Sequence, residues 1–446
     1  MKRVRRGFTL IEVLVSVAAG GIVLVGLLVL SKSATAAFNE EVRVGAVQTS
    51  VRAALLRIQG DLTLASYQST PHLAAERGAV RRRGATANAT AATLGAVKSL
   101  AGLRIDPRGS DGRAPRNVAN LYANDVLEVA GNLAATDAFV VLDVLIGGGS
   151  GAGCDRVILN MDSPPIWRLR DSTAPDPNVL LLARLQALFV PAAPAADNAN
   201  YLVRLVDPSG RAQYLSTCSG RASLTLVGAG STHVAIDVTA GPTERLLTTA
   251  DTGGVGGWPG RSVGGCTINP VYRVRYEIGT AAVLAPSLGA VDPSSDANPK
   301  YDLYRTYLNA AGDPVELPEL VAEYIAGMRL GLTVDNAPVG APGDPRTLLR
   351  VPADDASAVR AWAGTVDATV DLPAAAVSVG PQRIRSVAVE VSARVALADR
   401  DRPELAGSSV RRYCVPGACV PGAQVYARAR TLAMEVAIRN HAGVFF

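Results

Sequence analysis

The chain has 446 residues, of which 48 % are hydrophobic and 19 % are charged, so it is neither a disordered nor a collagen-like polymer. Its length corresponds to about two or three packed units. The formal net charge is +5, but Lys2, Arg3, Arg5 and Arg6 supply four of these charges, which leaves +1 for the remainder. A nearly neutral remainder gives no reason to expect nucleic-acid binding, which usually depends on a clustered basic face.

The first thirty residues consist of a basic leader, Gly7, and an almost wholly apolar segment from Phe8 to Leu30. No charged residue occurs between Val13 and Ser31, which is close to the length that a helix needs to cross the hydrocarbon layer. The basic leader is expected to stay in the cytoplasm. The chain after Ser31 is therefore predicted to lie on the outer side of the membrane.

An ordinary secretory signal is the alternative interpretation, and the stretch from Ser33 to Ala37 could serve as its cleavage site. A plain anchor helix is a second alternative. Glu12 argues against both, because a carboxylate at the start of a membrane-spanning segment is costly unless it is paired. Neither a signal peptide nor a simple anchor gains anything from such a residue.

The run from Gly7 to Glu12, Gly-Phe-Thr-Leu-Ile-Glu, resembles the prepilin motif of type IV pilins and type II secretion pseudopilins. The resemblance implies that a membrane prepilin peptidase cuts after Gly7 and methylates the new N-terminus at Phe8. It also implies that Glu12 meets the N-terminal amine of a neighbouring subunit during stem assembly. An unpaired carboxylate and an unpaired ammonium strongly favour each other at low dielectric, so the physics agrees with this role.

The segment after Ser31 predicts the amphipathic half of the same helix, covering residues 31–66. Apolar residues recur there at spacings of three and four, with charged residues on the other faces. The recurring residues are Val44, Val47, Val51, Leu55, Ile58 and Leu62. One continuous helix from Phe8 to about Leu64 would be roughly 85 Å long at 1.5 Å per residue.

Residues 67–446 are predicted to form a globular head outside the cytoplasm, in which short β-like runs alternate with turns rich in Pro and Gly. Probable insertions lie near residues 70–120 and 240–265. The predicted strands are Asp125–Ala130, Ala138–Ile146, Arg156–Met161, Tyr201–Val206, Ser223–Val227, His233–Val238, Val271–Ile278, Tyr301–Leu308 and Glu323–Thr333. The predicted class is therefore α+β, a long stem helix packed on an antiparallel β-rich head.

The last two predicted strands are the clearest. Valines at positions 387, 389, 391 and 395 form a period-two face, and the segment 424–439 returns after a turn. These segments predict a long antiparallel hairpin at the edge or centre of the head's sheet.

Several blocks of the C-terminal half are similar to PilW-type minor pilins. They are Tyr214–Gly220, Val271–Tyr276, Leu317–Asp335, Arg383–Val391 and Arg430–Asn440. This resemblance implies a structural subunit that works with other minor pilins.

Five cysteines occur, and none forms a C-x2-C pair. Cys414 and Cys419 enclose Val-Pro-Gly-Ala, a natural turn, so a local disulfide between them is predicted in an oxidising compartment. Two reduced thiols are the alternative. The pairing of Cys154, Cys218 and Cys266 does not follow from the sequence.

No motif indicates an enzyme, a cofactor or a metal. His72, His233 and His441 lie far apart, and we interpret them as surface or structural residues. Gly147–Ala152 satisfies a loose dinucleotide pattern, but a strand-like run follows it, so a hairpin loop is the better interpretation. The carboxylates at Asp354–Asp355 and Asp292–Asp302 fit no EF-hand spacing, although a calcium site there is conceivable.

Trp167, Trp258 and Trp362 are expected to be packing anchors.

The resemblance thus implies a minor pilin at or near the tip of a type IV pilus, which helps to prime assembly and to present a tip adhesin. Its expected partners are other minor pilins, the major pilin, the adhesin, the prepilin peptidase and the inner membrane. The expected location is the bacterial inner membrane, with a single pass and a periplasmic head, and then the pilus tip. The alternatives are a type II secretion pseudopilin and, less well supported, a DNA-uptake or surface-binding module.

Overall fold

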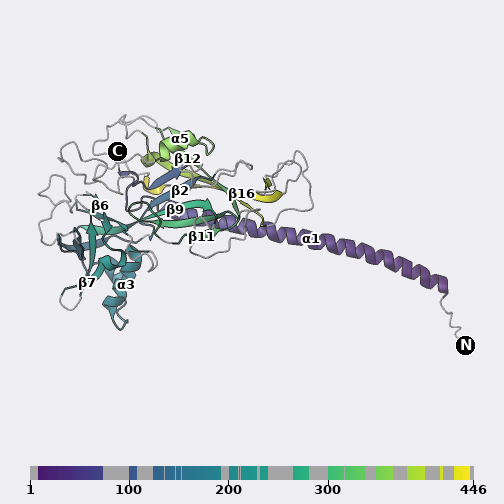
Figure 1. Ribbon diagram of the computed structural model, residues 1–446, viewed down its shortest axis with the longest axis horizontal. Coiled ribbons are helices and arrows are strands. Elements are labelled where there is room, and N and C mark those ends of the chain that lie inside the picture. Colours follow the sequence, from purple (N-terminus) through teal and green to yellow (C-terminus); the bar gives the residue numbers. More distant parts are fainter. Residues whose placement is uncertain are drawn as a thin grey trace.

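The computed structural model describes residues 9–73, 100–107, 124–191, 200–239, 265–280, 300–336, 347–364, 379–396, 412–414 and 426–441, apart from residues 135, 146, 152, 209, 211, 229–231 and 316. Most of the two predicted insertions lies outside these residues. The protein has a long stem helix whose N-terminal part projects from a β-rich head (Figure 1).

The stem is a single helix, α1 (Leu10–Thr63), which confirms the predicted continuous helix. The large apolar side chains of its first half are exposed, whereas Val47, Val51, Leu55, Ile58 and Leu62 are buried in the head. Val44, the first residue of the predicted stripe, is half-buried. The helix therefore changes along its length from a bare apolar rod to a packed core element.

The described strands of the head form two antiparallel sheets. The larger sheet contains β1 (Leu103–Asp106), β2 (Val126–Gly131), β3 (Phe139–Leu145), β4 (Asp155–Leu159), β5 (Leu202–Val206), β6 (Ala212–Thr217), β7 (Leu224–Val227), β8 (His233–Thr239), β9 (Thr267–Gly279), β10 (Asp302–Leu308) and β11 (Glu319–Ala322). The smaller sheet has the order β13 (Leu348–Val351), β12 (Ile325–Asp335), β14 (Ile384–Arg394), β16 (Tyr426–Ala437) and β15 (Arg412–Cys414).

All nine predicted strands of the region 125–333 are present, with ends shifted by a few residues. The predicted C-terminal hairpin is also confirmed, because β14 and β16 pair antiparallel from Ser386↔Ala437 to Arg394↔Ala429. The hairpin is central rather than peripheral in its sheet: β12 lies on one side of it and the short β15 on the other.

The long strand β9 joins two parts of the head. Its second half pairs with β2 and β10, beside the stem. Its first half pairs with β3 and β5, and the chain of pairings β9–β3–β4–β8–β6–β5–β9 closes on itself. Residues 139–271 thus contain a small closed barrel, which we call the barrel lobe.

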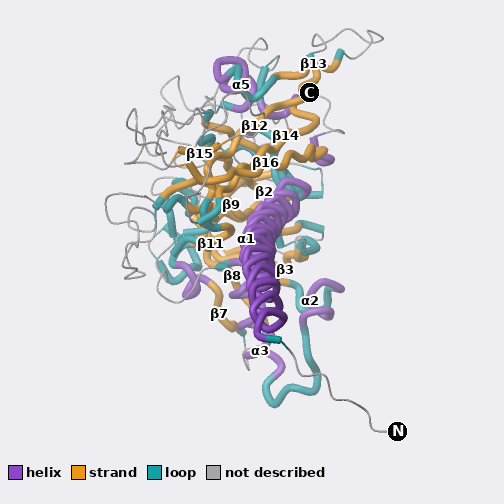
Figure 2. Tube along the Cα trace, turned by 90° about the vertical axis from the view of Figure 1, so that its right-hand side faces the viewer, coloured by secondary structure: helices purple, strands orange, loops and turns teal. Residues whose placement is uncertain are grey.

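The described residues of the head include three α-helices in places where no helix was predicted. The barrel lobe carries α2 (Pro164–Leu169) and α3 (Pro177–Phe189), and the smaller sheet is flanked by α5 (Ala356–Ala363). Leu181, Leu185 and Phe189 of α3 are buried in the core of the barrel lobe. In the view of Figure 2, the smaller sheet lies above α1, and β3 and β8 of the barrel lobe lie on either side of the helix.

Separate hydrophobic cores underlie the two parts. The main core contains the buried stripe of α1, the second half of β9 and the inner faces of β12, β14 and β16. The core of the barrel lobe forms around Phe139, whose ring lies 5.5 Å from that of Phe189. The stem therefore packs into the main core, and the barrel lobe has a hydrophobic core of its own.

Candidate functional site: the stem and its seat in the head

The N-terminal end of the stem is organised by Thr9 and Glu12. Thr9 caps α1, and its backbone N–H and hydroxyl each donate to Oε2 of Glu12 at 3.0 Å. The backbone N–H of Glu12 donates in return to the Thr9 hydroxyl, 3.4 Å away, which completes a capping box. The Glu12 carboxylate is therefore turned back toward the N-terminus, while its other oxygen accepts no hydrogen bond from the described residues.

The two predicted processing residues, Gly7 and Phe8, lie outside the described residues. In the chain, Phe8 immediately precedes Thr9, the residue that holds the Glu12 carboxylate. An N-terminal amine at position 8 would thus begin one residue from the Glu12 capping box.

The helix is long and apolar enough to cross a membrane near its N-terminus. None of the most apolar stretch is buried against the head, and large side chains from Leu10 to Leu30 are exposed along its whole length. A bare apolar surface of this extent is stable only in lipid or against other apolar helices.

A buried polar cluster holds the stem in the head. Nε of Arg305 on β10 lies 2.7 Å from Oδ2 of Asp61 on α1, and the Tyr276 hydroxyl donates to the same oxygen, also at 2.7 Å. Burial alone would lower the pKa of Arg305, but the charge and hydrogen bond of Asp61 outweigh burial and raise that pKa. Burial, followed by the Asp61 charge, raises the pKa of Tyr276, so this hydroxyl remains protonated.

A surface pair extends this cluster. Glu319 on β11 lies 3.0 Å from Arg57 on α1 and 3.4 Å from Arg305. The stem is thus linked by charge to two neighbouring strands of the larger sheet.

The C-terminal end of the chain closes over the end of the stem. The Asn440 side-chain amide donates to the carbonyls of Ala65 at 2.8 Å and Thr63 at 3.3 Å. These carbonyls lie at the C-terminal end of α1, where backbone acceptors lose their intrahelical partners. Asn440, the last residue of the segment Arg430–Asn440, thus caps the C-terminal end of the stem helix.

His441 completes the closure. Its Nδ1 lies 3.1 Å from the Ile384 carbonyl, which can only accept, so Nδ1 donates and Nε2 accepts from the Ser66 hydroxyl at 2.7 Å. Complete burial is the main cause that lowers the pKa of His441 to about 4. The neutral imidazole therefore connects the turn after the stem to the smaller sheet.

The turn after the stem depends on two close backbone approaches. Ser66 has a φ of 62°, and a Cβ at Gly131 would lie only 2.4 Å from the Leu64 carbonyl oxygen. A Cβ at Gly102 would overlap the Ser66 hydroxyl. Only glycine therefore fits at these two positions beside the end of the stem.

The barrel lobe contains a disulfide between Cys154 and Cys218. Cys266 is buried and takes no part in a disulfide, which resolves the pairing that the sequence left open. The predicted Cys414–Cys419 pair remains a prediction, because Cys419 lies outside the described residues.

The glycine-rich stretch at residues 147–152 connects β3 to β4, which confirms the hairpin-loop interpretation. Asp237, fully buried on β8, accepts from the backbone and hydroxyl of Ser150 in this loop and from Arg156. These hydrogen bonds hold the loop against β8. The loop leads into strand β4, whereas a dinucleotide-binding loop leads into a helix that binds the pyrophosphate.

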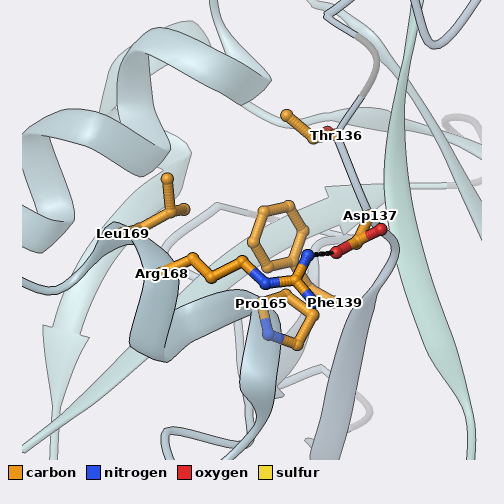
Figure 3. A pocket seen from close by; sticks show the side chains of 6 residues that line it. All are labelled: Thr136, Asp137, Phe139, Pro165, Arg168 and Leu169. Carbon is orange, nitrogen blue, oxygen red and sulfur yellow. Dashed lines mark hydrogen bonds and ion pairs between the residues drawn. The ribbon is translucent and has the colours of Figure 1, made fainter.

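A shallow pocket of about 180 Å³ lies beside α2, lined by Thr136, Asp137, Phe139, Pro165, Arg168 and Leu169. Arg168 and Asp137 form an exposed ion pair across it (Figure 3). This arrangement holds no nucleophile paired with a base. Among the described residues, no three His, Cys, Asp or Glu side chains converge as a metal site.

Asp355 takes a structural role, because its carboxylate accepts from the Ala358 N–H and caps α5.

The structure describes two of the three tryptophans that were expected to be packing anchors. Trp362 is buried in the main core, as expected of a packing anchor, but Trp167 is exposed on α2, so that expectation was wrong. Trp167 lies one residue after Ile166, which takes the buried position of this short helix. Trp258 lies outside the described residues.

His72 is buried and contacts Gln382, whereas His233 is half-buried and contacts the Thr232 hydroxyl.

Comparison with known families supports the interpretation of the N-terminus. The family model for the prokaryotic N-terminal methylation motif matches residues 2–28, which include Gly7, Phe8 and Glu12. No match was found among curated proteins or among solved structures. The chain thus carries the N-terminal segment of type IV pilin-like proteins, which supports a structural, pilin-like or pseudopilin-like role and membrane anchoring.

Proposed function

We propose that this protein is a PilW-type minor pilin, a non-enzymatic subunit at or near the tip of a type IV pilus. In this role the prepilin peptidase removes residues 1–7 and methylates Phe8, and the apolar half of α1 holds the protein in the inner membrane. The periplasmic head then moves to the pilus tip with the assembling filament. There it helps to prime assembly together with other minor pilins and to present a tip adhesin.

The observation that carries this proposal is the division of α1 into a bare apolar half and a seated half. Leu10–Leu30 has no cover within the described chain, while Val47–Leu62 is fixed in the head by apolar packing and by Asp61. A subunit built in this way presents its free helix to lipid before assembly and to other helices afterwards.

The size of the head supports a tip position. About 380 residues follow one stem, and the barrel lobe extends to one side of the stem axis (Figure 1). Such bulk is hard to repeat in a tightly packed helical filament, whereas a subunit at the tip has no neighbour above it.

The disulfide agrees with a periplasmic head. Cys154 and Cys218 are bonded, and structural disulfides form and persist in oxidising compartments such as the bacterial periplasm. The basic leader at the other end of the apolar segment favours the cytoplasm. The two observations support a topology in which the two ends of the segment lie on opposite sides of the membrane.

Two measurements test the proposal. Mass spectrometry of the native protein should find methylated Phe8 as the first residue, and immunogold labelling of sheared pili should place the head at one end of the filament. A chain that starts at Met1, or label spread along the filament, would contradict it. Retention in the envelope together with impaired secretion of folded proteins would indicate the pseudopilin alternative.

A further inference from the structure

The shallow pocket beside α2 belongs to the barrel lobe, whose core is separate from that of the stem. Its walls come from two segments, the residues that precede or begin β3 and one face of α2. In Figure 3, the Arg168 side chain runs past the Phe139 ring to Asp137. We call this site the α2 pocket; its lining residues are Thr136, Asp137, Phe139, Pro165, Arg168 and Leu169.

Helix α2 is short but firmly placed. It begins with two prolines, and Ile166 is fully buried in the core of the barrel lobe. Pro165, Arg168 and Leu169 are separated by three and four residues, so they share another face of the helix, the one that lines the pocket. The buried residue thus fixes the direction of the pocket-lining side chains.

The charged groups of the α2 pocket retain binding capacity. The side chains of Arg168 and Asp137 are 68 % and 48 % exposed, and an ion pair this exposed contributes little to stability. Among the described residues, Arg168 is the only donor to the Asp137 carboxylate. The guanidinium has further N–H donors and the carboxylate has further acceptor sites, so both can bind a ligand while they remain paired.

This ion pair favours a neutral ligand. Arg168 and Asp137 are the only charged residues that line the pocket, and their charges cancel. A charged ligand gains little there, because the attraction of one partner is offset by the repulsion of the other. Hydroxyl groups avoid this conflict, since they can donate to the carboxylate and accept from the guanidinium.

The remaining lining and the size of the pocket restrict the ligand further. Pro165 and Leu169 present C–H groups beside the ion pair. The volume is about 180 Å³, below the range of about 300–1,000 Å³ that is typical of pockets for drug-sized ligands, so the ligand is one small unit. A sugar ring combines adjacent hydroxyl groups at its edge with C–H groups on its faces, which matches both parts of the lining.

We propose that the α2 pocket binds one neutral sugar residue of a glycan. Hydroxyl groups of the ring contact Asp137 and Arg168, and the C–H groups of one face lie on Pro165 and Leu169. Because the pocket is shallow and its charged groups are exposed, the sugar can be part of a longer chain. This proposal goes beyond the pilin-like role and does not depend on the position of the protein in a filament.

The wall of the α2 pocket is connected to the end of the stem. The side-chain amide of Asn132, which is fully buried, donates to the Thr136 carbonyl at 2.8 Å and to Oε1 of Gln68 at 2.7 Å. The backbone N–H of Asn132 donates to the Tyr67 carbonyl, also at 2.8 Å. Tyr67 and Gln68 follow the stem helix directly. A pull on a bound glycan is therefore passed to the stem through these hydrogen bonds as well as through the chain.

Sugar binding by the full-length protein tests the proposal. Glucose, galactose, mannose and N-acetylglucosamine are added separately to the protein in a detergent that has no sugar head group, since such a head group would compete. Saturation-transfer NMR then measures the affinity of each sugar. At least one of them should bind saturably, and the absence of saturable binding by all of them would overturn the proposal.

A charged sugar tests the preference for neutral ligands. Galacturonate is the matched probe, because it carries a carboxylate where galactose has a hydroxymethyl group. It should bind more weakly than the best neutral sugar of the panel. Tighter binding of galacturonate would show that the site selects anions and would contradict the proposal.

A pair of matched variants locates the binding. Asp137→Asn should weaken it at least about tenfold, because charge-assisted hydrogen bonds are lost. Asp171→Asn is the control: its carboxylate is also exposed and lies 3.9 Å from an arginine, Arg184, but it does not line the pocket. The control should bind sugar like the native protein, and the thermal midpoint should be the same in both variants. Equal binding by the two variants would place the sugar elsewhere and overturn the proposal.

The failure of this proposal can be separated from the failure of the pilin-like role. If sheared pili contain the protein at their tips but no sugar binds, the sugar site is wrong and the proposed function stands. If pili lack the protein while Asp137→Asn still abolishes sugar binding, the tip assignment is wrong and the α2 pocket stands.

Discussion

Asp61 of the stem and Arg305 of β10 form an ion pair inside the head, with 2.7 Å between Oδ2 and Nε. The Arg305 side chain is 2 % exposed, and Asp61 is the buried partner of its charge, whereas Glu319, 3.4 Å away, is half-exposed. Asp61 and Arg305 are 244 positions apart in the chain, and their contact joins the stem to the larger sheet. This pair therefore resists sliding of the stem relative to the head.

Asp61→Asn should lower the free energy of unfolding by about 3 kcal/mol, because it leaves the buried Arg305 guanidinium with only the half-exposed Glu319 as a counter-charge. Thermal or urea unfolding of the detergent-solubilised protein would measure the change. Arg57→Ala is the control: it removes only the surface pair with Glu319, in which both side chains are about half exposed. A pair of this kind contributes about 0–1 kcal/mol. Equal losses in the two variants would show that Asp61 does not hold the stem.

His441 should make the stability depend on pH. Burial lowers the pKa of His441 to about 4 in the folded protein, against about 6.5 for an unfolded histidine. Above pH 6.5 both states are neutral, so the residue has no pH effect there. As the pH falls from 6.5 toward 4, only the unfolded state gains the proton, and stability is lost, up to about 3 kcal/mol.

Unfolding measured at intervals between pH 7.5 and pH 5 would show this loss in the native protein. His441→Gln removes the titrating group but retains a donor and an acceptor, so its stability should change less over the same interval. The interval ends above the range in which most carboxylates titrate, which keeps their contribution small. Parallel curves for the two proteins would exclude His441 as the source.

The stem and most strands could be predicted from the sequence because their signals are local. The spacing of Val47, Val51, Leu55, Ile58 and Leu62 specifies a helix face without knowledge of its partner. The alternating valines of β14 specify a strand in the same way. These patterns were confirmed because the same faces are buried in the head.

The missed helices also had a local signal, at their first residues. Ser163 and Asp176 each precede a proline that begins a helix, and the Asp176 carboxylate accepts from two N–H groups of α3. A capping residue followed by proline is a helix-start pattern. The prolines themselves are equally common in turns, so without their capping residues they do not indicate a helix.

The polar contacts of the stem could not be predicted. Asp61 meets Arg305, and Ser66 meets His441, only because the strand pairings bring distant segments together. The Cys154–Cys218 pairing depends in the same way on the barrel lobe, where Cys218 donates its backbone N–H to Asp237 of β8. Sequence spacing does not contain this information.

Thiol counting tests the cysteine predictions together. If Cys414 and Cys419 are bonded, the unfolded, unreduced protein should expose one thiol, that of Cys266. If they are reduced, it should expose three. Alkylation under denaturing conditions, followed by mass spectrometry, distinguishes the two results and also checks the Cys154–Cys218 bond. Five alkylated thiols would contradict both pairings and the oxidising compartment.

Replacing Cys154 and Cys218 together by serine should destabilise the barrel lobe by about 2–4 kcal/mol, since the bond constrains a long loop of the unfolded chain. The stem contacts belong to the other core and should not change. Hydrogen exchange measured element by element should therefore show faster exchange in β4, β6 and β8 and unchanged exchange in the buried part of α1. Equally faster exchange in α1 would show that the two cores unfold together.

Glu12 allows the charge of the carboxylate to be separated from its capping role. Glu12→Gln keeps a side chain that can accept from Thr9, since glutamine also serves in a capping box, but it removes the negative charge. If Glu12 pairs with the N-terminal amine of a neighbouring stem, this variant should insert in the membrane and be processed normally, yet enter pili poorly. Glu12→Ala should show the same defect.

Immunoblots of membrane and sheared-pilus fractions measure membrane insertion with processing and entry into pili. Glu41→Gln, a matched change in the exposed amphipathic half, is the control. Normal entry of Glu12→Gln into pili would mean that the carboxylate serves only to cap its own helix.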